Sequence, residues 1–260
     1  MVKVNLAGVG FRLDLLHEKN NQRFRKYMTD RDKEMADSDQ SGREEEYVSW
    51  KMISFQGVSR VDLQKNAECE FQYILLPISD RLLKYGKCII HGTAFKWRGL
   101  GSIFMGPSGI GKSTQYKNWK REYGHEVEIL NGDKPILEKR DDNSYYIHPS
   151  PWKGKEGWAG MKGARLGGII YLEQTVHNDI KRLKPSEAAV PILCQLFYSV
   201  ETRCQVEQAV SFTRGILENV PIWRLQNTGD AASAILTHSI LSEHFAKEYF
   251  KEDSGKGEQS

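Results

Sequence analysis

The sequence predicts an α/β domain, and three observations support this prediction. Strand-like and helical hydrophobic patterns alternate through the centre of the chain, between about residues 87 and 174. A glycine-rich turn at 106–113 joins an apolar strand pattern to an amphipathic helix pattern. From Pro185 onward the pattern becomes mainly helical. The chain has 260 residues, enough to bury a substantial core.

The expected domain organisation is a single domain over residues 1–250, followed by a disordered tail at 251–260. Residues 1–85 are expected to add strands to the same core. Within them residues 17–46 are strongly polar, and the Asp/Ser/Gln/Gly-rich part of this stretch is expected to be an exposed loop or a poorly ordered insertion. The N-terminal strands expected are one or two in 2–16 turning at 7–11, and one each at 47–55 and 69–77. A helix is expected around Phe24–Met28. A second, short helix is expected to be capped by Ser79 or Asp80 and stopped by Gly86.

The central and C-terminal elements alternate in type. Residues 87–106 are expected to form two β runs folded at the turn 98–101, and 134–151 a hairpin with its turn at 141–143. The remaining elements expected are a helix at 112–123 stopped by Gly124, strands at 126–133, 167–174 and 220–225, a loop at 152–168, and helices at 186–198, 201–218 and 230–250, the last capped by Asp230.

Composition excludes several classes of protein. The net charge is +3 and the charges are spread through the chain, so we expect no nucleic-acid partner. The four cysteines contain no CxxC pair, which argues against a zinc site or a disulfide framework. The N-terminus lacks a signal-peptide pattern, and no run of about eighteen apolar residues occurs. We therefore expect a cytoplasmic protein without a membrane partner.

Residues 106–113 read Gly-Pro-Ser-Gly-Ile-Gly-Lys-Ser and satisfy the phosphate-loop (Walker A) pattern at every fixed position. Glycines at 109 and 111 permit the backbone angles that turn successive amides toward a phosphate, and the following helix adds its positive N-terminal end. Lys112 is expected to reach the β- and γ-phosphates, and the Ser113 hydroxyl to ligate Mg²⁺. The nucleotide-binding residues expected are Gly106, Pro107, Ser108, Gly109, Ile110, Gly111, Lys112, Ser113 and Thr114.

Two further residues are candidates for the chemistry. Asp133 follows a strand expected to run parallel to the strand before the phosphate loop, so its carboxylate is expected beside the phosphates, where it would hold Mg²⁺. The alternative interpretation of Asp133 is a turn residue in Asn-Gly-Asp-Lys. His91 lies fifteen positions before Gly106 on a strand that folds back, which would bring its imidazole alongside the nucleotide. The alternative for His91 is a structural histidine.

The stretch from His91 to Lys134 resembles the catalytic domain of HPr kinase/phosphorylase, a member of the phosphoenolpyruvate carboxykinase-like fold. The matching positions are His91, Gly99-Leu-Gly101, the phosphate loop, Gly124-His125 and Asp133. The resemblance implies mixed β-sheets around the phosphate loop, a helical C-terminal part, catalytic roles for His91, Asp133 and Lys112, and homo-oligomers. One departure stands out. The family presents two adjacent aspartates where this chain has Gly132-Asp133.

Residues 70–200 also look similar to the shorter HPr-kinase-like proteins of peptide-modification cassettes, such as the lasso-peptide kinases. The shared motifs are NGDKPIL, SPWKGKEGW and GGIIYLEQ. In the second of these, Lys153 and Lys155 are candidates to bind a phosphate or an acidic substrate, and Glu156 to supply the second carboxylate. Trp152 and Trp158 are candidates for aromatic pocket walls. The alternative is a solvated loop with its tryptophans folded inward.

The leading function is an ATP- or GTP-dependent and Mg²⁺-dependent kinase that phosphorylates a hydroxyl, expected to be a serine of a peptide or protein substrate. One alternative is a kinase of the same fold that acts on a small molecule. The other is a non-catalytic ATP-binding partner protein in a peptide-modification system, which the glycine at 132 favours.

Overall fold

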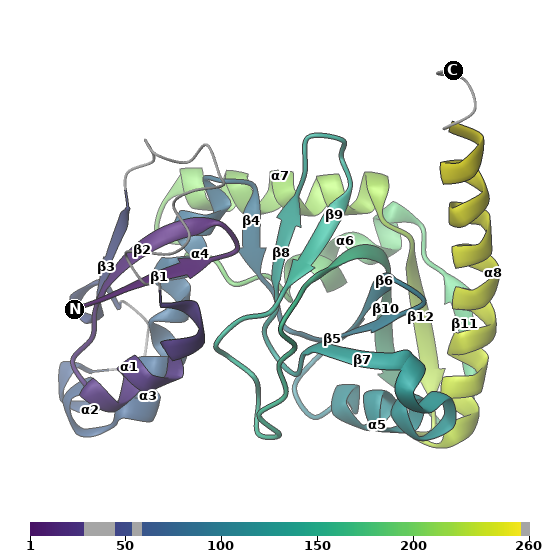
Figure 1. Cartoon of the computed structure of the whole chain (residues 1–260), viewed down its shortest axis with the longest axis horizontal. Helices are drawn as coiled ribbons and strands as arrows, with labels where there is room; N and C mark the ends of the chain where they lie inside the picture. Colours follow the sequence, from purple (N-terminus) through teal and green to yellow (C-terminus); the bar gives the residue numbers. More distant parts are fainter. Residues whose placement is uncertain (29–44, 54–58, 256–260) are drawn as a thin grey trace.

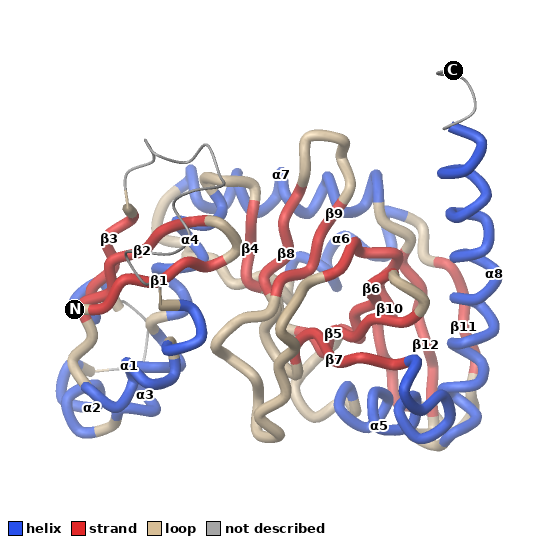
Figure 2. Tube along the Cα trace, in the orientation of Figure 1, coloured by secondary structure: helices blue, strands red, loops and turns tan. Residues whose placement is uncertain are grey.

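The computed structural model describes residues 1–28, 45–53 and 59–255, and the side chains of that range as far as residue 246. It shows an elongated molecule with two parts, an N-terminal lobe made by residues 1–83 and a larger body (Figure 1). The predicted α/β class is confirmed, with mixed sheets around the phosphate loop and a helical C-terminal part (Figure 2). Residues 29–44 of the polar stretch predicted at 17–46, and the end of the tail at 256–260, lie outside the described residues.

The N-terminal lobe has its own small sheet, with strand order β1-β2-β3. β1 (Val2–Leu6) and β2 (Val9–Asp14) form the hairpin predicted in 2–16, and β3 (Glu46–Ser49) pairs with β2 in parallel. The two turn residues, Ala7 and Gly8, have φ angles of 52° and 84°. Positive φ at both positions is typical of the tight turns whose twist suits a two-residue hairpin.

The strand predicted at 69–77 is wrong, because this segment is helical. Phe71, Ile74, Leu75 and Ile78 are buried in one apolar cluster, and their spacing is that of a helix face. Asn66 caps the segment by accepting hydrogen bonds from two backbone amides. The helical elements of the lobe are α1 (Glu18–Arg23), η1 (Arg25–Tyr27), η2 (Trp50–Met52), α2 (Arg60–Lys65), α3 (Ala67–Tyr73) and α4 (Leu75–Leu83).

The predicted cap at Ser79 or Asp80 is also wrong, since both residues lie inside α4. The Ser79 hydroxyl accepts a hydrogen bond from the Ile89 amide at 3.0 Å, and Asp80 accepts one from the Ser199 amide at 2.8 Å. These polar side chains therefore attach α4 to the body instead of starting a helix. Gly86 follows the helix with φ of 67°, consistent with the predicted stop.

In the body, the described residues form a nine-stranded arrangement in the order β4-β8-β9-β10-β6-β5-β7, with β12 pairing β10 and β11 pairing β12. The long strand β10 pairs with β9 through its first residues and with β6 and β12 through later ones. It therefore connects the strands β4, β8 and β9 with the strands around the phosphate loop. The strands are β4 (Lys87–Ile89), β5 (Gly92–Trp97), β6 (Leu100–Met105), β7 (Val127–Asn131), β8 (Ile136–Lys139), β9 (Tyr145–His148), β10 (Ala164–Gln174), β11 (Asp179–Arg182) and β12 (Ile222–Asn227).

The helices of the body cover the sheet in two groups. Phe212 of α7 packs against Tyr145 of β9, whereas Trp119 of α5 and Phe245 of α8 pack near Trp97 of β5. α8 continues beyond the predicted end at 250. The elements are α5 (Lys112–Tyr123), η3 (Gly124–Glu126), α6 (Pro185–Leu193), α7 (Arg203–Asn219) and α8 (Ala231–Gly255). None of the helices in the described ranges has the length and hydropathy needed to span a membrane.

Lobe and body share one hydrophobic cluster. Ile89, Ile136 and Trp152 of the body are buried together with lobe residues such as Phe24 and Phe71. The lobe thus adds its own sheet beside the body, and apolar packing holds the two parts together.

Candidate functional site

The phosphate loop lies between the end of β6 and the start of α5. Gly106, Gly109 and Gly111 have φ angles of 140°, 81° and 102°, which glycine adopts readily. A Cβ atom at Gly109 or Gly111 would meet nothing within 4 Å, so the space above this part of the loop is open. The loop therefore suits a phosphate group, since an open glycine-rich turn leads here into a helix N-terminus.

Lys112 lies beside this hollow and is only 8% exposed. Its ammonium donates hydrogen bonds to the carbonyl oxygens of Gly106 at 2.8 Å and Pro107 at 3.0 Å. Burial lowers the pKa of Lys112 to about 8; Asp133 opposes the shift and Lys134 adds to it. A poorly solvated ammonium in such a place favours binding of an anion.

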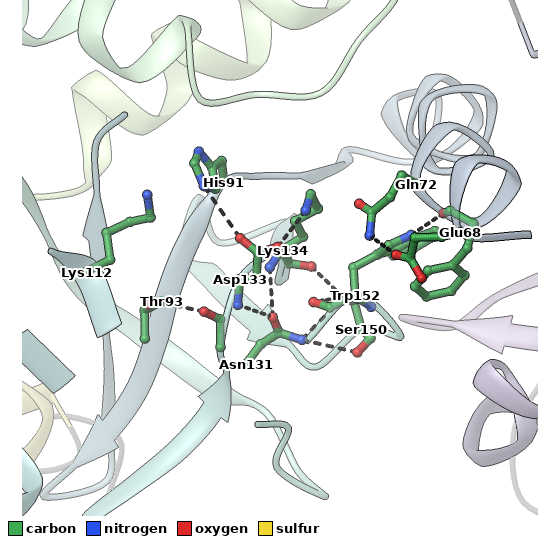
Figure 3. A network of polar contacts seen from close by, with 12 residues as sticks. Glu68, Gln72, His91, Thr93, Lys112, Asn131, Asp133, Lys134, Ser150 and Trp152 are labelled. Atoms are coloured by element: carbon green, nitrogen blue, oxygen red, sulfur yellow. Dashed lines mark hydrogen bonds and ion pairs between the residues drawn. The ribbon is translucent and has the colours of Figure 1, made fainter. Parts of the chain in front are cut away.

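His91 and Asp133 meet next to the phosphate loop (Figure 3). β6 and β7 both run antiparallel to β5 and therefore run in the same direction, as predicted, so both end at the same edge of the sheet. Asp133 follows β7, and His91 lies in the link between β4 and β5 instead of within a strand. The Nε2 atom of His91 lies 3.5 Å from Oδ1 of Asp133.

The electrostatics of this pair favour an uncharged imidazole. Burial lowers the pKa of His91 to about 4, the Lys112 ammonium adds to the shift, and Asp133 opposes it. The other carboxylate oxygen of Asp133 accepts a hydrogen bond from the Lys134 ammonium at 2.5 Å. At neutral pH the imidazole is therefore available to accept a hydrogen bond.

Asn131 holds the backbone that carries Asp133, and sequence reasoning did not single it out. Its Oδ1 accepts hydrogen bonds from the amides of Asp133 at 3.0 Å and Lys134 at 2.9 Å. Its Nδ2 donates to the Ser150 carbonyl oxygen at 3.1 Å. Such Asx turns are typical of Asn-Gly sequences, so the pattern itself contained this signal.

The position that would hold a second aspartate has no room for a side chain. A Cβ atom at Gly132 would lie 2.6 Å from the carbonyl oxygen of Lys153 and 3.2 Å from Cβ of Trp158. The Gly132 amide also donates a hydrogen bond to the Trp158 carbonyl oxygen at 2.9 Å. The loop between β9 and β10 therefore occupies the space beside Gly132.

That loop, residues 149–163, brings the predicted substrate residues to the site in different ways. Trp152 is 1% exposed, and its ring stacks on Phe71 of the lobe at 5.5 Å between centroids. Trp158 packs on Tyr116 at 5.0 Å. Trp152 is thus buried and still lines the cavity, whereas Trp158 is half-buried and does not belong to the cavity lining. Glu156 forms an ion pair with Lys117 of α5 at 3.5 Å.

A cavity of about 880 Å³ joins all these features. The phosphate loop, the His91–Asp133 pair and the loop 149–163 form part of its lining. Residues of the N-terminal lobe complete the wall, which the sequence did not predict. These are Arg23, Glu68, Phe71 and Gln72.

A magnesium site at the phosphate loop would need few protein ligands. The described residues contain no group of three or more His, Cys, Asp or Glu side chains arranged for a metal. Ser113 and Asp133 both line the cavity and supply the oxygen donors that Mg²⁺ prefers, the rest normally coming from phosphate and water. The donor set thus fits Mg²⁺ bound together with a nucleotide.

Comparisons with known proteins find similarity at the level of structure but not of sequence. No protein-family model matches the chain, and no curated protein matches it by sequence. Among solved structures it is similar to the HPr(Ser) kinase/phosphatase from Coxiella burnetii, with 12% identity and a TM-score of 0.37 over 66% of this chain and 99% of that chain. A similarity this low transfers no activity, so a functional assignment has to rest on the site itself.

Proposed function

We propose that this protein is an ATP-dependent and Mg²⁺-dependent kinase that transfers the γ-phosphate to a hydroxyl group, a serine of a peptide or protein. One observation carries the proposal. The buried Lys112 ammonium lies at a phosphate loop and lines the same cavity as His91 and Asp133, which are 3.5 Å apart. Phosphoryl transfer needs this combination of a cation at the phosphates and a hydrogen-bond acceptor for the attacking hydroxyl.

The phosphate loop and Lys112 bind the triphosphate in this proposal. Backbone amides of 106–113 bind the phosphate oxygens, and the Lys112 ammonium exchanges its two carbonyl partners for them. Ser113 and Asp133 would hold Mg²⁺, which offsets negative charge on the phosphates when it is bound. An anion beside Lys112 also removes part of the cationic field that lowers the pKa of His91.

The His91–Asp133 pair orients the acceptor hydroxyl and takes its proton. The two side chains lie 3.5 Å apart, so both can contact the same acceptor hydroxyl. A neutral imidazole accepts a hydrogen bond from the hydroxyl without needing to lose a proton first.

The choice of a peptide or protein acceptor rests on the extent of the cavity. It continues past the phosphate loop to the wall made by the N-terminal lobe, so one bound nucleotide does not account for all of its lining. A cavity of about 880 Å³ is at the large end of ligand sites and leaves room for a second substrate.

The proposal is tested by incubating the protein with ATP, Mg²⁺ and a library of serine peptides, and measuring the gain of phosphate by mass. Lys112→Met should lower the rate by roughly a hundredfold or more, because it removes a charged partner of the phosphates. Lys96→Met is the matched control, since Lys96 forms an ion pair with Glu128 outside the cavity.

Three outcomes would contradict the proposal. Normal transfer by Lys112→Met would remove the phosphate loop from the mechanism. Tight ATP binding without phosphate on any acceptor would identify a nucleotide-binding partner protein. Transfer to a small hydroxyl compound but to no peptide would identify a small-molecule kinase.

A further inference from the structure

Building on the proposed kinase function, we propose that the acceptor peptide carries an acidic residue beside its serine, and that a cationic wall of the cavity binds this residue. The cationic wall is formed by Arg23, Lys153 and Lys155. Arg23 comes from α1 of the lobe and the two lysines from the loop 149–163. The wall therefore joins both parts of the molecule.

The loop places its two lysines next to the reacting groups. Gly154, which lies between them, has φ of 71°, and a Cβ atom there would be 3.0 Å from Cβ of Asp133. Hence the backbone between Lys153 and Lys155 packs directly against the proposed acceptor-binding aspartate. A peptide whose serine reaches Asp133 must bring its neighbouring residues past these lysines.

On the lobe side, the wall is preorganised. Trp152 donates a hydrogen bond from Nε1 to the Phe71 carbonyl oxygen at 2.7 Å, which fixes the loop to the lobe. The Arg23 guanidinium lies 4.3 Å from the centre of the Phe71 ring and pairs with Glu68 at 2.5 Å. Figure 3 shows Trp152, Glu68 and Gln72 on the opposite side of Asp133 from Lys112.

The charges that line the cavity are not balanced. Its three acidic residues each pair with a base: Glu68 with Arg23, Asp133 with Lys134, and Glu156 with Lys117. Lys153 and Lys155 have no ion-pair partner within the described part of the chain, although both line the cavity. An acidic side chain of a substrate would supply the missing anion.

The surroundings of Lys153 favour an anion as well. Burial lowers the pKa of Lys153, and the nearby Lys26 ammonium of the lobe adds to the shift. Two cations held near each other repel, and a carboxylate between them relieves that repulsion. In the proposed function the phosphate loop and Lys112 already bind the triphosphate. The cationic wall is therefore assigned to the acceptor peptide.

The test measures peptide binding directly, and so does not depend on catalysis. Fluorescently labelled serine peptides with flanking Asp or Glu are compared with the same peptides carrying Asn or Gln, with a non-hydrolysable ATP analogue and Mg²⁺ present. We expect the acidic peptides to bind roughly tenfold more tightly at low salt, since one or two charge-assisted contacts are gained. High salt should reduce this preference because Lys155 is exposed.

Lys153→Gln/Lys155→Gln should reduce the preference for acidic peptides to less than about threefold, by loss of the same contacts. Lys84→Gln/Lys96→Gln removes the same charge outside the cavity and should retain the preference. Binding of the ATP analogue is measured with both variants, and the thermal midpoint shows that each is folded.

Equal binding of acidic and neutral peptides by the wild type would overturn the proposal. The proposal would also fail if the two double variants showed the same preference for acidic peptides. If the Lys153/Lys155 variant lost only nucleotide binding, the two lysines would be assigned to the triphosphate instead. A preference for acidic peptides with no phosphate transfer would support the wall and contradict the kinase function, so the two proposals fail separately.

Discussion

At the scale of single residues, the properties of the site depend on which groups are charged. Lys112, Lys134 and Asp133 surround the His91 imidazole, and two of these three carry positive charge. Adding a proton to His91 would place a third cation among them in a partly buried position. The folded protein therefore resists protonation of His91 more than the unfolded chain does.

This resistance predicts a pH dependence of stability. Because the pKa of His91 is about 4 in the folded protein and about 6.5 in the unfolded chain, the unfolded state binds more protons between these values. Stability should fall as the pH falls through this window. Urea unfolding at pH 7 and pH 4.5 should show that wild type loses on the order of 2 kcal/mol more than His91→Gln does. Equal losses would show that His91 is not held in its neutral form.

Gly132 gives a second prediction at this scale. A side chain there overlaps the Lys153 carbonyl oxygen, so Gly132→Ala and Gly132→Asp should both destabilise the protein by about 1–3 kcal/mol. Gly10→Ala is the matched control, because a Cβ atom there would meet only the flexible Glu45 side chain at 3.6 Å. Thermal unfolding should give a clearly lower midpoint for the Gly132 variants alone. A Gly132→Asp protein that is as stable as wild type would show that the loop 149–163 can move to accommodate the side chain at little cost in free energy.

At the scale of elements, the loop 149–163 organises the site more than any strand does. It makes backbone hydrogen bonds to residues 130, 132 and 134, so it follows the end of β7 closely. Its Trp152 is buried between Phe24 and Phe71 of the lobe. The loop therefore positions Asp133 and fixes the lobe in the same stretch of chain.

Trp152 is accordingly a sensitive point of the structure. Trp152→Ala should cost about 3–5 kcal/mol through lost packing and also weaken acceptor binding. Trp152→Phe keeps most of the packing but loses the hydrogen bond to the Phe71 carbonyl oxygen, and should cost about 1–3 kcal/mol. Denaturant unfolding and peptide affinity measured for both variants check this order. If Trp152→Ala retained normal peptide affinity, the loop would not position the acceptor site.

Local patterns explain which elements were predictable. The phosphate loop, α5 and the hairpin of β5 and β6 follow from glycine positions and short-range periodicity, so the sequence was sufficient for them. The sequence predicts a strand over α3 and the first residues of α4, because a short apolar run does not by itself distinguish a strand from a helix. The lobe's share of the cavity depends on the packing of Phe71 against Trp152, 81 positions apart in sequence, which no local pattern reveals.

At the scale of the whole molecule, the cavity is lined by residues of both the N-terminal lobe and the body. A ligand that contacts both parts stabilises the folded state by binding it and not the unfolded chain. ATP with Mg²⁺ at about a hundred times its dissociation constant should contribute about 2.7 kcal/mol. For a chain of 260 residues this predicts a rise of roughly 5–10 °C in the thermal midpoint.

Removal of the metal should reduce this shift. With a chelator present, Mg²⁺ is no longer available to connect the phosphates with Ser113 and Asp133. The rise in thermal midpoint with ATP should therefore be clearly smaller. The Ser113→Ala protein should show the smaller shift even with Mg²⁺ present. A shift that is the same with and without Mg²⁺, in wild type, would show that Ser113 and Asp133 do not hold a metal.

The shared strand β10 has a consequence for how the molecule is made. β6, which leads into the phosphate loop, has β5 on one side and β10 on the other, and β10 in turn needs β12. During synthesis, the phosphate-loop strand leaves the ribosome more than a hundred residues before β12 does. The nascent chain thus carries the phosphate loop without this part of its sheet until β12 has been synthesised, and in a translation time course ATP binding should appear only after that point.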